Sequence, residues 1–397
     1  MRSCHYTITP NDVQHRALDV LQAALRLADH GPKCTARAVL TVLAWAAACG
    51  RSIAAACAAL RQAPSDQAVR NALLATLPEY ARLQAQLNQA LADGLPKVLR
   101  GRKADVAIDL TLLPYYGLPA HDARELYRSK QKAGTRYFHA YATAYVILRG
   151  CRYTLGLRGV WQADPWEDLV GDLLRQVRKL GVKVRLLLLD RGFYSVGVIR
   201  YLQAARCPFI MPAIRRGHRQ QHPDGASGTW VFTTRQRSGW GTYTLHERRS
   251  QRTATVTIAV CCHRLPPTTR SGRPIKKRRV VWLYALWGVQ PKSVAWVREK
   301  YRQRFAIETT YRQLGQARIK TSTRQPVLRL LIVGLALVLR NVWVWLHWQV
   351  LAKKRRGWRR VDLNQLTFEG LLHWLQRVAE ECFGLTDQVV SERPFPA

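Results

Sequence analysis

The chain has 397 residues, of which 48% are hydrophobic, so it can form two or three domains with substantial cores and is not dominated by disorder. Its 63 lysines and arginines against 25 aspartates and glutamates give a formal net charge of +38, far more than solubility requires. This balance implies a polyanionic partner, with nucleic acid as the leading candidate. Nine cysteines without a framework spacing favour a reducing cytosol, and we expect no signal peptide because the N-terminus lacks a continuous apolar run.

The first hundred residues, 1–100, are predicted to be helical, because they are rich in alanine and leucine with helical periodicity. The breaks between helices fall at Gly31, Gly50, Pro64 and Pro78. Segments 52–62 and 65–76 are two short helices, and each begins at a serine that can cap it. Their spacing is compatible with a helix-turn-helix that directs Arg70 toward a DNA major groove, and also with simple packing in a bundle.

Residues 101–214 follow an α/β order. Three runs with β-branched and aromatic content are predicted strands, followed by an amphipathic helix, a fourth strand, a helix and a fifth strand. The ranges are 104–110, 136–148 and 152–160, then 164–180, 183–189, a helix starting at Ser195, and 208–213. This is the order of an RNase H-like α/β domain.

Two aspartates each end an apolar, strand-like run in this segment. Asp109 is predicted to lie on the central strand, and Asp190 at the carboxyl end of the fourth strand, where open α/β sheets expose their sites. We therefore expect the two aspartates to be neighbours in space. Taken alone, Asp109 can equally cap a turn, and the sequence Asp190-Arg-Gly can simply end a strand.

Residues 215–290 are predicted to be a β-rich insertion. Four runs at hairpin spacing are its expected strands, and the strongly basic loop 265–279 is a candidate phosphate contact or a solvated hairpin tip. The runs are 228–233, 241–245, 253–260 and 280–288. Cys261 and Cys262 should project to opposite faces of a strand, which argues against a zinc site at Cys261-Cys262-His263.

After the insertion, residues 301–312 are predicted to form a helix. Positions three and four apart share one stripe, and the stripe holds Tyr301, Arg304, Glu308, Tyr311 and Arg312. Glu308 then lies between two arginines, which is also the pattern of a salt-bridge ladder on a solvated face.

The segment 326–352 resembles a membrane span. Four polar residues interrupt it, and each arginine at a bilayer centre costs about 2.5–3.5 kcal/mol. They are Arg329, Arg340, Asn341 and His347. We therefore predict a buried domain helix with these residues on its wetter side, followed by a terminal helix over 366–378.

Together, Asp109, Asp190 and Glu308 make an acidic cluster in a strongly basic protein. Carboxylates close together repel one another, so their burial side by side favours a divalent metal between them. Two Mg²⁺ ions about 3.5–4 Å apart can activate an attacking water or 3′-hydroxyl and stabilise the leaving oxygen of a phosphodiester.

At these residues the chain resembles the DDE transposases of bacterial and archaeal insertion sequences, in the IS-four type superfamily with a Tyr-Arg-Glu-Lys signature. The resemblance covers about residues 104–351. The family's first aspartate matches Asp109 in Ile-Asp-Leu-Thr, and its second matches Asp190 in Leu-Asp-Arg-Gly-Phe-Tyr. The signature tyrosine, arginine and glutamate match Tyr301, Arg304 and Glu308 at spacings of three and four.

The resemblance implies an RNase H-like, retroviral integrase-like catalytic domain interrupted by the β-rich insertion. The expected divisions are an N-terminal helical domain 1–100, a first catalytic part 101–214, the insertion 215–290, a second catalytic part 291–352 and a C-terminal helical tail 353–397.

The resemblance also implies a cytoplasmic, nucleoid-associated enzyme that cuts and strand-transfers an insertion-sequence element. It would act as a homodimer on terminal inverted repeats and target DNA, without a membrane. Two Mg²⁺ ions, replaceable by Mn²⁺, would be held by the three acids. The expected DNA contacts are Tyr301, Arg304, Arg312, Arg191 and Arg70. In similar transposases a tryptophan stacks a flipped base, and the candidates for that role are Trp230, Trp240, Trp282 and Trp287, which are otherwise half-buried strand residues.

One departure from the family pattern concerns the signature lysine, whose position falls on Gly315 in this chain. Arg312, Arg318 or Lys320 can supply a phosphate contact instead. Two other functions stay open: an RNase H-type nuclease that hydrolyses without joining, and a catalytically silent DNA-binding protein derived from a transposase. The intact acidic triad argues against the second.

Overall fold

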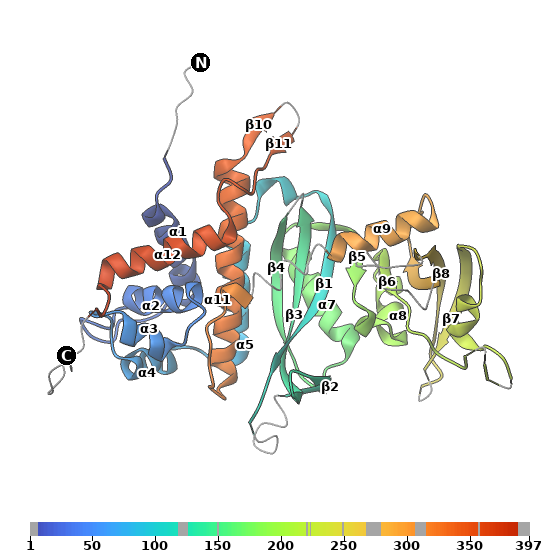
Figure 1. Cartoon of the computed structure of the whole chain (residues 1–397), viewed down its shortest axis with the longest axis horizontal. Coiled ribbons are helices and arrows are strands. Elements are labelled where there is room, and N and C mark those ends of the chain that lie inside the picture. The colour runs from blue at the N-terminus through green and yellow to red at the C-terminus, as the bar shows by residue number, and fades with distance from the viewer. Residues whose placement is uncertain are drawn as a thin grey trace.

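The computed structural model describes residues 7–117, 126–148, 151–219, 221–222, 224–247, 250–266, 279–305, 315–355 and 358–387. Glu308, Tyr311 and Arg312 lie outside the described residues. A group of helices occupies one end of the molecule, and a twisted sheet with helices on both faces occupies the other (Figure 1).

The helices predicted before residue 100 are confirmed. They are α1 Pro10–Leu25, α2 Ala36–Ala48, α3 Ile53–Ala59, α4 Asp66–Thr76 and α5 Tyr80–Asp93, followed by a 3₁₀ turn at Lys97–Leu99. Ser52 and Ser65 cap α3 and α4 as expected, because their side-chain oxygens accept hydrogen bonds from the backbone N–H groups of Ala55 and Ala68.

The C-terminal segments complete this helical part. They are α11 Pro326–Trp345, a π-helical turn at Leu346–Leu351, a small hairpin of β10 Lys353–Arg355 and β11 Trp358–Arg360, and α12 Phe368–Phe383. Figure 1 shows α11 and α5 side by side, between helices α1 to α4 and the sheet. By length and composition α11 and the turn after it could cross a membrane, but 89% of the apolar window is buried inside the protein. The prediction of a buried helix is therefore confirmed.

The prediction that the polar residues of this segment lie on a wetter side of the helix is wrong. Arg340, Asn341 and His347 are all buried, with exposed fractions of 2%, 3% and 0%. The Asn341 amide nitrogen donates to the carbonyls of Thr154 and Leu91, and its oxygen accepts from the Thr154 N–H at 2.9 Å. Asn341 tolerates burial because the neighbouring backbone satisfies its hydrogen bonds, and the His347 Nε2 atom has a backbone partner in the Leu366 carbonyl.

The described strands outside that hairpin form one nine-stranded sheet in the order β2-β3-β1-β5-β6-β9-β8-β7, with β4 also paired to β3. The strands are β1 Lys103–Pro114, β2 Tyr127–Lys132, β3 Thr135–Leu148, β4 Cys151–Val160, β5 Lys183–Leu189, β6 Phe209–Pro212, β7 Gly239–His246, β8 Thr253–Arg264 and β9 Arg279–Trp287. Strands β1, β5 and β6 are mutually parallel, and the other pairs are antiparallel. The predicted order of strands and helices over residues 101–214 is confirmed, with β2 as an additional strand.

The segment predicted as an insertion continues the same sheet, because β9 pairs with β6 and brings β8 and β7 with it. The prediction of a strand over 228–233 is wrong, since Gly228–Thr233 is a 3₁₀ helix. Gly228 has a φ of +58°, and the buried Thr229 hydroxyl donates to the Ile214 carbonyl, so the chain turns here although its composition is typical of a strand.

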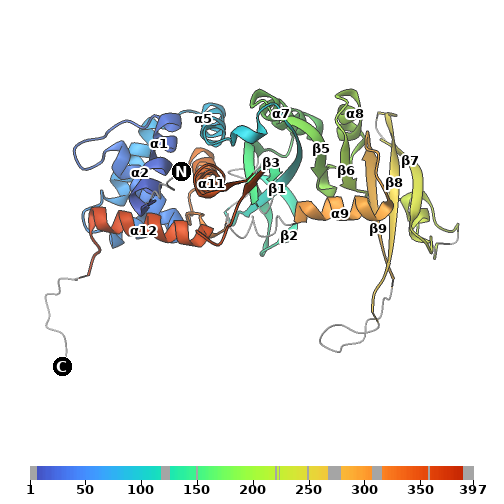
Figure 2. The same cartoon turned by 90° about the horizontal axis from the view of Figure 1, so that it is seen from above.

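Helices cover the two faces of the sheet unequally. Figure 2 shows α7 Trp166–Lys179 and α8 Val196–Ala204 on one face, and α9 Val294–Phe305 on the opposite face. As predicted, α7 carries acids in its first turn and bases in its last turn. Beneath α9 lies a separate small core that includes Tyr145, Leu188, Tyr284, Val297 and Tyr301. This core fixes α9 against the centre of the sheet.

Candidate active site

The two predicted aspartates lie next to each other on adjacent strands. Strands β1 and β5 run parallel with Ile108 opposite Leu189, so the next residues along the two chains are Asp109 and Asp190. Neighbouring strands are about 4.8 Å apart. Asp109 is held on its other side by pairing with Thr143 of β3. The expectation that these aspartates are neighbours in space is therefore met.

One arginine joins the two carboxylates. The Arg304 Nη1 atom lies 3.1 Å from Asp109 Oδ2, and its Nη2 atom lies 3.0 Å from Asp190 Oδ1. The Arg304 and Asp109 side chains are only 7% and 12% exposed, whereas the Asp190 side chain is 45% exposed. The other Asp109 oxygen accepts a hydrogen bond from the Leu110 N–H at 2.8 Å. The pair is thus buried on one side and open to solvent at Asp190.

Arg304 is held through both its main chain and its side chain. Arg152, buried on β4, donates a hydrogen bond to the main-chain carbonyl of Arg304, and the Tyr301 ring lies 5.2 Å from the guanidinium carbon. Burial by itself would lower the pKa of Arg304, but Tyr301, Asp109 and Asp190 outweigh it and raise that pKa above its ordinary value. Arg304 therefore stays charged. Burial raises the pKa of the Tyr301 hydroxyl, so this group stays protonated.

A second ion pair fixes α9 one turn earlier. The Lys300 Nζ atom lies 2.5 Å from Asp105, and the Arg185 Nε atom lies 2.7 Å from it. Burial alone would raise the pKa of Asp105, but hydrogen bonds from Arg185 and Lys300 outweigh it and lower that pKa. Asp105 and Asp109 share one face of β1 because side chains alternate along a strand.

Sequence reasoning missed Asp105, Lys300 and Arg152. The available signal was the period of two in β1, which places an acid four residues before Asp109 on the same face. For Arg152 no pattern in the sequence distinguishes it from an exposed strand arginine.

The other predicted site residues are placed differently. Arg191 follows Asp190 directly and is exposed, in a 3₁₀ turn at Arg191–Phe193 that the buried Phe193 anchors. Arg70 lies on α4 in the helical part, away from the carboxylates (Figure 1), and forms a 3.4 Å ion pair with Asp66. Gly315 is exposed, and a Cβ built there meets nothing within 4 Å, so no steric reason excludes a side chain at this position.

The predicted tryptophans fall into two groups. Trp230 lies in the 3₁₀ turn Gly228–Thr233, and the Arg215 and Arg219 guanidinium carbons each lie 5.1 Å from the centre of its ring. Trp240 is 42% exposed. Trp282 and Trp287 are half-buried on β9, as expected of strand residues. Cys261 is buried and Cys262 half-buried on β8, which agrees with their predicted projection to opposite faces.

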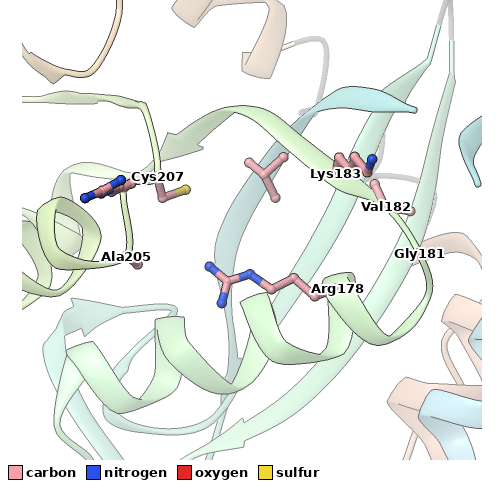
Figure 3. Close-up of a pocket in the computed structure, with 8 residues that line it drawn as sticks. Arg178, Gly181, Val182, Lys183, Ala205 and Cys207 are labelled. Carbon is pink, nitrogen blue, oxygen red and sulfur yellow. The ribbon is translucent and has the colours of Figure 1, made fainter. Parts of the chain in front are cut away.

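A hollow of about 320 Å³ at the other end of β5 is separate from this site. Figure 3 shows Arg178 of α7, Lys183 and Cys207 around it. Lys183 begins β5, whereas Asp190 follows its end, so about 23 Å of strand separates the two positions.

The donor set at the carboxylates fits a divalent cation. Carboxylate oxygens are the ligands that hard cations prefer, and the two here already converge on one cationic group. Among the described residues, Asp109 and Asp190 are the ones that would hold such an ion. In the part of the chain that the structure describes, two histidines and one carboxylate also gather at His218, His222 and Asp224, in a different part of the molecule.

Comparisons with known proteins bear on the family and the fold. A family model described as Transposase DDE domain matches residues 100–340, which is more than half of the chain. No curated protein matches the sequence. A solved structure of a piggyBac transposase synaptic complex with hairpin DNA is similar, with a TM-score of 0.55 and 10% identity over 96% of this chain and 82% of that one. At that identity the likeness shows the fold alone.

The chain therefore belongs to the transposase DDE domain family, whose members generally use divalent metal ions. It is a DNA transposase, an enzyme of DNA recombination.

Proposed function

We propose that Asp109, Asp190 and Glu308 are the metal-binding acids of this transposase, and that they hold two Mg²⁺ ions, with Mn²⁺ able to substitute. The single observation that supports this most is the meeting of Asp109 and Asp190 on Arg304 at the carboxyl end of β5. Glu308 follows Arg304 by four residues in the sequence, and four residues are about one helical turn.

The two aspartates contribute differently to the proposed site. Asp109 is buried and fixed by β1, so it defines the position of the site, whereas Asp190 is open enough for a phosphodiester to approach. The metal ions supply charge stabilisation and an activated oxygen nucleophile. Arg304 keeps the two carboxylates oriented, and the Tyr301 ring packs against the Arg304 guanidinium.

We assign the catalytic fold to the RNase H-like class and the protein to the IS-four type superfamily. The support for the fold is the strand and helix order over β1, β3, β4, α7, β5, α8 and β6. The support for the superfamily is the pair of strings around Asp109 and Asp190 together with the spacing of Tyr301, Arg304 and Glu308.

The proposed partner is DNA, with the element's terminal inverted repeats and the target as substrates, bound by a homodimer in the cytoplasm. A net charge of +38 supports a polyanionic partner. The similar piggyBac protein is described in a synaptic complex with hairpin DNA. Proposed DNA contacts are Arg191 beside Asp190 and Arg70 on α4, which are both exposed. Tyr301 and Arg304, which the sequence also predicted as DNA contacts, are 1% and 5% exposed, so their proposed role is to orient the carboxylates instead. Arg312 stays a candidate contact from the sequence and lies outside the described residues.

A joining assay separates this function from a nuclease that only hydrolyses. The protein is incubated with Mg²⁺ or Mn²⁺ and with DNA that carries the flanking ends of its own element and a free 3′-hydroxyl, together with a target plasmid. A transposase forms joined products, and Asp109→Asn abolishes them while DNA binding is unchanged. Cleaved ends that never join would contradict the proposal. A titration with Mn²⁺ counts the bound ions. Light scattering of the protein–DNA complex gives its mass, which shows whether two protein chains are bound.

A further inference from the structure

A second and larger hollow, of about 530 Å³, opens beyond the carboxyl end of β1. One wall is the end of β1 and the residues that follow it, and the other is the segment that leads into α11. The residues that line it are Leu113, Pro114, Tyr115, Tyr116, Gly117, Arg318, Ile319, Lys320, Thr321, Ser322, Arg324, Arg329 and Ile332. We call this hollow the β1 groove.

The β1 groove is strongly basic. Arg318, Lys320 and Arg324 are exposed, and none of them forms an ion pair within the described part of the chain. Arg329 adds a fourth cation, whose Nε donates to the Thr323 carbonyl at 2.6 Å. No acidic residue is among the lining residues that the structure describes. A basic concave surface without compensating acids is suited to a polyanion.

The groove also offers an aromatic face. Tyr116 is 73% exposed, yet its hydroxyl donates a hydrogen bond to the Ala133 carbonyl at 2.9 Å, which restricts the ring. Directly before it, Tyr115 is buried, and its carbonyl accepts from the Thr135 hydroxyl at 2.8 Å. An exposed, restrained tyrosine beside several cations is the combination that nucleic-acid-binding grooves use, because bases stack on the ring while the cations contact phosphates.

The basic wall is anchored in the fold. Ala317 and Ile319 are buried, so the intervening Arg318 and the following Lys320 face outward. The Lys320 N–H donates to the Arg51 carbonyl at 3.0 Å, which ties this wall to the turn before α3. Ordering these side chains on a fixed backbone therefore costs less entropy than ordering a free loop.

The groove lies in line with the proposed catalytic carboxylates. Leu113 is four residues beyond Asp109 on β1, which corresponds to about 13 Å at 3.3 Å per residue. A DNA duplex rises about 3.4 Å per base pair, so about four base pairs span this distance. A DNA segment whose scissile phosphate lies at Asp109 and Asp190 can therefore reach the groove.

We propose that the β1 groove binds the phosphodiester backbone of the DNA segment next to the cut, with Arg318, Lys320 and Arg324 on phosphates and Tyr116 against a sugar or base. The position of the groove relative to the cut rests on the proposed catalytic site. The binding itself does not, because it needs neither metal nor the carboxylates.

Salt-dependent binding tests the three cations. Arg318→Gln/Lys320→Gln/Arg324→Gln is compared with Arg178→Gln/Lys183→Gln/Arg206→Gln, which removes the same charges around the 320 Å³ hollow at the start of β5. Affinity for a mixed-sequence duplex is measured in metal-free buffer over a range of salt concentrations. Each lost phosphate contact lowers the slope of log K against log salt by about 0.9, so the groove variant should lose about 2–3 and the control less than about 1. Equal losses in the two variants, or no loss in the groove variant, overturn the proposal.

A second pair of variants tests the aromatic face. Tyr116→Ala should weaken binding by about tenfold, and Tyr116→Phe should keep most of the affinity, because the ring rather than the hydroxyl contacts the DNA. Equal affinity of the alanine variant and the wild type overturns the role of Tyr116. Asp109→Asn in the same metal-free assay should bind like the wild type. If Asp109→Asn still cleaves DNA once Mn²⁺ is added, while the groove variant shows the reduced salt slope, the catalytic assignment fails and the groove stands.

Discussion

Replacing Arg304 with glutamine removes the cation that Asp109 and Asp190 share. The Arg304 and Asp109 side chains are 7% and 12% exposed, and removing one partner of a buried ion pair costs about 3–5 kcal/mol. The contact with Asp190 adds less than about 1 kcal/mol because that carboxylate is 45% exposed. In metal-free buffer we therefore expect Arg304→Gln to lower the free energy of unfolding by about 3–6 kcal/mol.

A divalent cation should restore part of this loss, since it can replace Arg304 as the counterion of both carboxylates. At a concentration one hundred times its Kd, such an ion contributes about 2.7 kcal/mol. Urea unfolding with chelator and with Mn²⁺ measures both values. The matched control is Lys300→Gln on the same helix, which removes one of the two cations that pair with Asp105 and leaves the proposed metal site intact. Mn²⁺ should stabilise this control no more than the wild type, and less than Arg304→Gln. A loss below about 1 kcal/mol for Arg304→Gln, or an equal metal response in both variants, refutes the reasoning.

Two further predictions concern the buried polar groups of α11 and the turn after it. Asn341→Leu leaves the Thr154 N–H and the carbonyls of Thr154 and Leu91 without their partner. It should therefore lower the free energy of unfolding, measured by urea denaturation, by about 3 kcal/mol. An unchanged urea midpoint would show that water replaces the amide. Burial lowers the pKa of His347 below its ordinary 6.5, while its Nε2–H donates to the Leu366 carbonyl. The unfolded chain thus binds more protons than the folded one below about pH 6.5, and stability should fall as the pH drops from about 7.5 to 5. His347→Gln should flatten this dependence in thermal melts, and an unchanged pH profile would contradict the role of His347.

The central pair of aspartates was predictable because each ends a strong local pattern. An apolar run before Asp109 and another before Asp190 predict strands, and the order of the elements then places the two strands together. The charged ends of α7 and the serine caps at Ser52 and Ser65 were readable for the same reason, since capping depends on residues within one turn.

Contacts between distant segments were not predictable in this way. The sequence placed Arg304 beside Glu308 on one helical stripe, whereas the structure shows its guanidinium reaching across to two strands. The Asp105–Lys300 pair and the burial of Asn341 also depend on which face of a helix meets which strand, and periodicity gives no such pairing. The turn at Gly228–Thr233 departed from its β-rich composition because of a positive φ and a hydroxyl hydrogen bond to a distant carbonyl.

Cleavage of a supercoiled plasmid that carries the element's flanking ends tests the three-carboxylate site most directly. Wild type, Asp109→Asn and Glu308→Gln are compared with Mg²⁺ and with Mn²⁺, at protein concentrations that give equal DNA binding. We expect only the wild type to cut, because each substitution removes a negatively charged metal ligand and leaves the basic surface unchanged. Cleavage by Glu308→Gln at the wild-type rate would contradict the proposed site and require a different third ligand.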